Sequence, residues 1–128
     1  MKRKKIAVDL DGTWATYTGW KGANHIGEPV AEVTRRIAVA LARDFDIVVF
    51  TARVANDSRA VVVAPIRFWV IQALRAAGVA LEVIEQRVTI SAVKTMDITE
   101  IWDDRAVGIA KNQGAPADIR DSLWYSLR

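Results

Sequence analysis

Short apolar runs in this chain alternate with longer segments that have the apolar spacing of helices. The runs are rich in β-branched and aliphatic residues and predict buried strands at 5–8, 47–50, 79–84 and 98–102. Apolar stripes recurring every four residues predict three helices, marked by Val33, Ile37 and Leu41, by Ile66, Val70 and Leu74, and by Ile119, Leu123 and Leu127. Because strands that alternate with helices form a parallel sheet, the sequence predicts an α/β fold with helices on both faces of the sheet.

Two details of this pattern stay open at the level of the sequence. The secondary structure of residues 88–93 is ambiguous. Pro65 is expected in the first turn of the second helix, although a kinked helix that begins near Ser58 is the alternative. Gly78 is expected to end that helix.

The composition limits the class of protein. The 128 residues are 52% apolar and 26% charged, which predicts one soluble globular domain over 1–128. The absence of cysteine excludes disulfides, thiolate catalysis and cysteine-bound zinc, and it is compatible with a cytoplasmic location. No apolar run approaches the roughly 18 residues of a membrane helix, so we expect no membrane contact. The basic cluster Lys2–Lys5 is expected to be a solvated tail, with contact to nucleic acid as the alternative.

Polar residues follow three of the predicted strands. Asp9 and Asp11 follow the first strand, Thr51 follows the second, and Asp103 with Asp104 follows the last. In parallel sheets ligands bind beyond the carboxyl ends of the strands, so these side chains are expected on one rim. Taken singly, each signal has a structural reading, such as a surface turn, a calcium loop or a helix cap.

These residue types suit the hydrolysis of a phosphate ester. Asp9, Asp103 and Asp104 offer carboxylates, and Asp11 its backbone carbonyl, to Mg²⁺, which prefers oxygen ligands. A carboxylate can attack phosphorus while a second carboxylate serves as acid and base. Further candidate contacts to the phosphate are the backbone N–H groups of Gly12 and Thr13, the Thr51 hydroxyl, and the side chains of Lys94 and Arg53. Arg53 could instead pair with Asp57.

The motifs together resemble those of the haloacid dehalogenase (HAD) superfamily of phosphohydrolases. Asp9–Thr13 is similar to its motif I, 47–51 to motif II, Lys94 to the motif III lysine, and 101–104 to motif IV. The resemblance spans nearly the whole chain. It implies a Rossmann-like, three-layer α/β/α core with a mostly parallel sheet of strand order 3-2-1-4.

The same resemblance assigns roles to individual residues. It implies that Asp9 is the nucleophile and Asp11 the acid and base. Asp104 would be the direct metal ligand and Asp103 a second ligand or a holder of water. The gaps between motifs leave no room for a large cap domain, so residues 14–28 are expected to form only a small flap.

A narrower likeness is to small phage and bacterial HAD proteins and to the phosphatase domain of polynucleotide kinase. Arg53, two places after Thr51, and Arg105, directly after the acid pair, match patterns common there. Thr95 departs from the family pattern, which commonly has proline after the motif III lysine. The flap residues Trp14 and Trp20 could stack on a base or pin the flap to the core.

The sequence thus predicts a magnesium-dependent phosphomonoester hydrolase that forms an aspartyl phosphate. Its substrate would be a nucleotide, a phosphorylated metabolite or the 3′-phosphate end of a nucleic acid, and no obligate protein partner is evident. The alternative is a non-catalytic regulatory or binding module with the same fold. A receiver-type phosphoacceptor is disfavoured, because receivers carry the acid pair on the first strand and the phosphorylated aspartate on the third.

Overall fold

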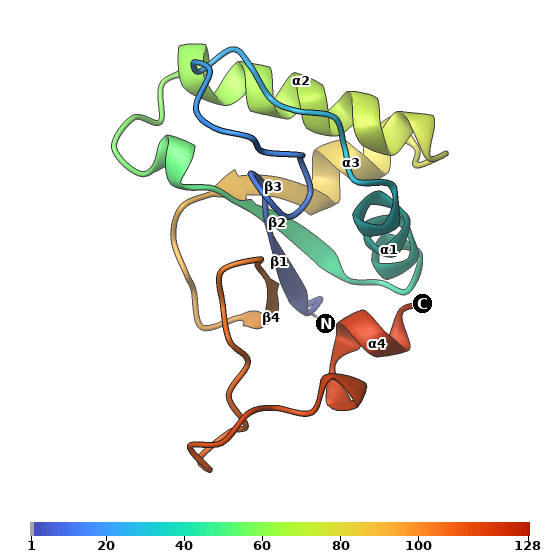
Figure 1. Cartoon of the computed structure of the whole chain (residues 1–128). Helices are drawn as coiled ribbons and strands as arrows, with labels where there is room; N and C mark the ends of the chain where they lie inside the picture. The colour runs from blue at the N-terminus through green and yellow to red at the C-terminus, as the bar shows by residue number, and fades with distance from the viewer. Residues whose placement is uncertain (1) are drawn as a thin grey trace.

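The computed structural model describes residues 2–128 and contains one four-stranded sheet (Figure 1). The strands are β1 (Lys5–Asp9), β2 (Asp46–Phe50), β3 (Val88–Ser91) and β4 (Ile98–Trp102). All neighbouring strands run parallel, in the order β3-β2-β1-β4. The predicted α/β class, the parallel sheet and its strand order are confirmed.

The helices are α1 (Ala31–Ala42), α2 (Ala60–Ala76), α3 (Leu81–Arg87) and the single turn α4 (Leu123–Ser126), with 3₁₀ turns at Ala52–Val54 and Ile119–Asp121. The predicted apolar stripes of α1 and α2 are buried. The apolar stripe predicted for the C-terminal helix is only partly buried, because Leu127 is buried whereas Ile119 is exposed.

Pro65 lies inside α2 and not in its first turn, so that expectation was wrong and the longer-helix alternative was closer. Proline has no N–H to donate to the carbonyl of the residue four positions earlier, which here is Val61. Val61 is exposed, so water can satisfy the carbonyl that loses this bond.

The predicted strand at 79–84 was also wrong. Most of this segment lies in α3, which is followed directly by β3 at the position that the sequence left ambiguous. In α3 and just beyond it, burial recurs at Ile84 and Val88, a helical spacing, while Glu82 and Glu85 face solvent. The β-branched residues at 83 and 84 imitate a strand, but packing against the sheet decides the outcome.

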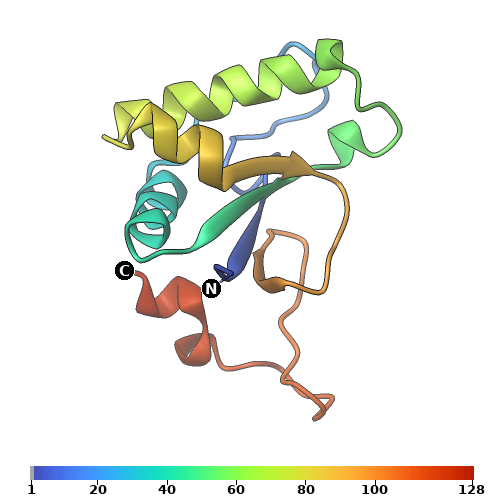
Figure 2. The same cartoon turned by 180° about the vertical axis from the view of Figure 1, so that it is seen from behind.

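All four α-helices pack against the same face of the sheet (Figures 1 and 2). The register places Ile6, Ile47 and Val88 side by side, and these residues share one buried cluster with residues of all four helices or their ends. The opposite face carries Ala7, Val48 and Thr89. The structure therefore has one helix layer on one sheet, and the expected third layer of helices is not found within residues 2–128.

The handedness of the connections explains this one-sided arrangement. The steps from β1 to β2 and from β2 to β3 go in the same direction across the sheet, and both pass through helices. Right-handed crossovers that step in one direction place their helices on one face. The step back from β3 to β4 runs through residues 92–97, which contain no helix.

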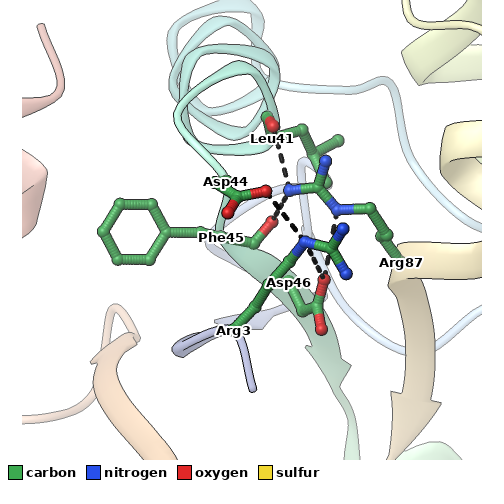
Figure 3. Close-up of polar contacts among 6 residues, drawn as sticks. All are labelled: Arg3, Leu41, Asp44, Phe45, Asp46 and Arg87. Atoms are coloured by element: carbon green, nitrogen blue, oxygen red, sulfur yellow. Dashed lines mark hydrogen bonds and ion pairs between the residues drawn. The ribbon is translucent and has the colours of Figure 1, made fainter. Parts of the chain in front are cut away.

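A polar cluster closes the end of the sheet where the strands begin (Figure 3). Arg87 donates hydrogen bonds to the carbonyl oxygens of Leu41 and Phe45 and to the Asp46 carboxylate, which ties α3 to the end of α1 and the start of β2. Arg3 donates to Asp44 at 2.9 Å. The contacts of Arg87 thus give the carbonyl oxygens after α1 and before β2 a charged donor.

The basic N-terminal residues lie at the same end. Lys2 and Lys5 both pair with Asp97, and Arg3 pairs with Asp44. Three of the four cations are thus matched by carboxylates, at the opposite end of β1 from Asp9. This arrangement offers less free positive charge to nucleic acid than the sequence alone suggests.

Candidate active site

The acidic residues meet where β1 and β4 end. Asp9 is the last residue of β1, and Asp103 and Asp104 directly follow β4, its neighbour in the sheet. One carboxylate oxygen from each of the three lies within 4.8 Å of the others. The convergence predicted from the strand ends is therefore present for these three residues.

Thr13 holds two of these carboxylates together. Its hydroxyl lies 3.3 Å from Asp9 Oδ2 and 3.0 Å from Asp104 Oδ1 and can donate to either oxygen. The same hydroxyl oxygen accepts a hydrogen bond from the backbone N–H of Asp104 at 2.9 Å. Thr13 thus fixes the loop after β4 to the loop after β1.

Gly12 allows the close approach of Asp104. A Cβ atom at this position would lie 2.7 Å from Asp104 Oδ2, closer than real Cβ contacts. Gly12 also has φ +90°, in the left-handed region that favours glycine. Both observations give the motif glycine a role in bringing the two acidic loops together.

The backbone donors of this loop are used within the loop. The N–H of Gly12 donates to the carbonyl of Ala15, and the N–H of Thr13 donates to the carbonyl of Leu10. The expectation that both groups face a phosphate is therefore not met. The turn needs these hydrogen bonds to reverse the chain directly after a buried strand.

The electrostatics of the cluster centre on Asp9. Burial, together with the neighbouring carboxyl groups of Asp104 and Asp103, raises the pKa of Asp9 to about 7. Burial also opposes the charge of Asp104, but hydrogen bonds from Thr13 and from a protonated Asp9 keep the pKa of Asp104 below its ordinary value. The crowded carboxylates therefore favour either a shared proton or a bound cation.

Asp11 faces a different partner. Its two carboxylate oxygens accept hydrogen bonds from Arg53 Nε at 2.8 Å and Arg53 Nη2 at 2.9 Å, a bidentate ion pair. The Asp11 side chain is not part of the three-carboxylate cluster. The alternative that Arg53 pairs with Asp57 is not found, because Asp57 binds Arg59.

Arg53 also holds the flap. It donates to the carbonyl oxygens of Ala23 and His25, and its guanidinium carbon lies 4.8 Å from the centre of the Trp20 ring. The Arg53 side chain is only 7% exposed. It connects Asp11, the turn after β2 and the flap in one contact network.

The base of the flap belongs to the core. Trp14 is fully buried, packs edge-on against Trp69 and donates to the Thr34 hydroxyl at 2.8 Å. Trp69 in turn donates to the Gly27 carbonyl at 2.9 Å. Of the two flap tryptophans, Trp14 is thus a structural anchor, and only Trp20 is available to a ligand.

The candidate site contains a cavity of about 530 Å³. Asp9, Asp11, Thr51, Asp103 and Asp104 contribute to its wall. Thr51 is 2% exposed; its hydroxyl oxygen accepts from the backbone N–H of Arg53, which leaves the hydroxyl hydrogen to be donated into the cavity. The volume lies within the usual range of small-molecule sites.

The basic side chains of the cavity wall are Arg53 and Arg105. Lys94, predicted as the charge-neutralising lysine, lies exposed in the loop between β3 and β4 and does not line the cavity. The loop between β3 and β4 is short and contains no helix, and Lys94 lies outside the cavity. Arg105 follows Asp104 directly and takes the position near the acids.

Two features of the cavity were not predicted from the sequence. Tyr17 is part of the wall, although nothing in the flap sequence distinguishes it. The Asp11–Arg53 ion pair was missed too, yet the sequence holds a signal for it. Asp11 and Arg53 follow the ends of adjacent strands by two and three residues, which brings them together on the rim.

Comparison of the chain with protein-family models, with curated proteins and with solved structures found no match. Within residues 2–128, every helix is too short or too polar to cross a membrane.

The raised pKa of Asp9 predicts how stability varies with pH. Between its ordinary value of 3.8 and about 7, Asp9 holds its proton more tightly in the folded than in the unfolded chain. In a buffer with a chelator, the free energy of unfolding should therefore decrease as pH rises through this range. Urea titrations should show a smaller decrease for Asp9→Asn; parallel pH curves for the two proteins would contradict the assignment.

Gly12 and Gly78 offer a matched pair of substitutions, because their φ angles are +90° and +89° and only Gly12 has a neighbour in the way. Alanine should strain the backbone by about 1–2 kcal/mol at either position. Only Gly12→Ala should also displace Asp104 and weaken the binding of Mn²⁺, measured by electron paramagnetic resonance, by about tenfold or more. Equal Mn²⁺ binding by the two variants would show that the close approach is unimportant.

Proposed function

We propose that this protein is a magnesium-dependent phosphomonoester hydrolase of the HAD type, with Asp9 as the covalent nucleophile. The observation that carries the proposal is the position of Asp9 at one cavity wall, beside the two acids that follow β4 and with Asp11 and Thr51 in the same wall. The resemblance of the four sequence motifs to those of the HAD superfamily supports it.

In the proposed first step, a carboxylate oxygen of Asp9 attacks the phosphorus atom of the ester. The bond between phosphorus and the ester oxygen breaks, and the leaving alkoxide takes a proton from Asp11. In the structure both oxygens of Asp11 accept from Arg53, so the Asp11 carboxyl group must leave this ion pair and take up a proton before it acts as the acid.

In the second step, water attacks the phosphorus of the aspartyl phosphate. Asp11 takes a proton from this water, the bond between phosphorus and Asp9 breaks, and inorganic phosphate leaves. Asp9 is thereby restored as a carboxylate and Asp11 as an acid.

The phosphoryl group needs partners throughout both steps. Thr51 is buried at the cavity wall and can donate its hydroxyl hydrogen to a phosphoryl oxygen. Arg105 is the cavity cation that is not committed to Asp11, so we assign to it the neutralisation of charge that was predicted for Lys94.

The donor set fits Mg²⁺. Asp9, Asp103 and Asp104 provide three carboxylate oxygens and no nitrogen or sulfur, which is the chemistry that this hard cation prefers. When bound, the cation would screen the negative phosphate from the negative nucleophile. Asp11 could join only through its backbone carbonyl, because its side chain binds Arg53.

The chemistry requires a phosphate ester, and the cavity does not narrow the substrate class further. Phosphorylated metabolites, nucleotides and nucleic-acid ends all remain candidates for a site covered only by the flap. Lys2, Arg3 and Lys5 lie at the other end of β1 and are paired with carboxylates, so they give no support to a long nucleic acid.

The chemistry is tested by release of phosphate from an aryl phosphate in the presence and absence of Mg²⁺. Asp9→Asn should lower kcat by about 10³-fold or more, because it removes the attacking oxygen charge. Asp118→Asn, the same change in an exposed turn, should leave kcat within about twofold.

Two results would contradict the proposal in different ways. Activity that survives in Asp9→Asn would exclude Asp9 as the nucleophile. A wild-type protein that binds Mg²⁺ but hydrolyses none of a broad panel of phosphate esters would favour the non-catalytic module.

A further inference from the structure

Trp20 differs from the other tryptophans of the chain. Trp14, Trp69 and Trp102 each donate their indole N–H to a partner within the protein, and Trp124 packs edge-on against Trp102. Trp20 is 61% exposed and lines the same cavity as the catalytic acids. Its ring is therefore apolar surface that a ligand in the cavity can reach.

The structure holds the Trp20 ring in place from one side. Arg53 stacks on one face of the ring, with its guanidinium carbon 4.8 Å from the ring centre. Arg53 is itself fixed by two bonds to Asp11 and by the carbonyl oxygens of Ala23 and His25. The ring is therefore supported without being buried, and its large exposed fraction leaves apolar surface for a ligand.

A second aromatic residue lies at the same cavity. Tyr17 is 41% exposed and comes from the flap, like Trp20. Exposed aromatic side chains beside a phosphate-binding site are what recognise nucleobases, because every base has a flat face that can stack. A sugar without a base would instead require several polar groups around its hydroxyls, and the flap part of the wall consists of these two aromatic residues.

We infer that the cavity contains a nucleobase subsite formed by Trp20, with Tyr17 beside it, and that the substrate is a phosphate ester whose base is adjacent to the phosphate. This inference rests on the proposed function. The chemistry is shared by a nucleoside monophosphate and by the terminal nucleotide of an oligonucleotide, and both belong in the test.

The experiment compares hydrolysis of thymidine monophosphates, a terminally phosphorylated oligonucleotide and base-free 2-deoxyribose phosphates by wild type, Trp20→Ala and Trp20→Phe. Stacking contributes about 1–3 kcal/mol per base. Trp20→Ala should therefore lower kcat/KM at least about fivefold for the base-bearing substrates, and by less than about twofold for the base-free ones. Trp20→Phe should restore most of the loss.

An equal loss for both kinds of substrate would overturn the subsite, because Trp20 would then only support Arg53 and the flap. No loss for either would overturn it as well. Loss with the oligonucleotide alone, or with the mononucleotides alone, would identify which source of the base is bound.

A binding measurement distinguishes failure of the proposed hydrolase function from failure of the nucleobase subsite. Calorimetry of thymidine monophosphate and deoxyribose phosphate binding in the presence of Mg²⁺ reports on the subsite without turnover. A base-dependent affinity that Trp20→Ala removes would support the subsite even in a protein that hydrolyses nothing. Equal affinities of the wild-type protein for the two ligands would exclude it.

Discussion

The close approach of Asp9 and Asp104 is the contact on which the candidate site depends. Gly12 leaves the space for it, and the Thr13 hydroxyl lies within hydrogen-bonding distance of both carboxylates. Burial of Asp9 opposes its charge, and the neighbouring carboxyl groups of Asp104 and Asp103 add repulsion, so the pKa of Asp9 is raised to about 7. A proton or a divalent cation relieves the repulsion, so the geometry that destabilises the ionised site is also what gives it affinity for a cation.

Much of the fold was predictable because parallel sheets have a strong sequence pattern. The strands β1, β2 and β4 and the buried stripes of α1 and α2 follow from apolar spacing alone. The segment 79–84 could not be assigned in this way, since β-branched residues on a short helix with one buried face imitate a strand. The single helix layer follows from the order of crossovers, which the pattern of apolar residues does not contain.

The site was predictable where it depends on strand ends and less so where it depends on loops. Asp9, Thr51, Asp103 and Asp104 lie together because parallel strands end on one rim. The position of Lys94 depends on how the loop before β4 folds, and the roles of Gly12, Trp20 and Arg53 depend on contacts between loops. Such contacts arise from residues far apart in the chain, and neither spacing nor composition records them.

The most direct test of the covalent mechanism is to trap the phosphoenzyme. The variant Asp11→Asn lacks the group proposed to activate water, so with an aryl phosphate, whose leaving group needs no acid, the intermediate should accumulate. After acid quenching, mass spectrometry of the digested protein should find the phosphoryl group on the peptide that contains Asp9. Steady turnover with no phosphoryl group on Asp9, or a phosphoryl group on a different residue, would contradict the mechanism.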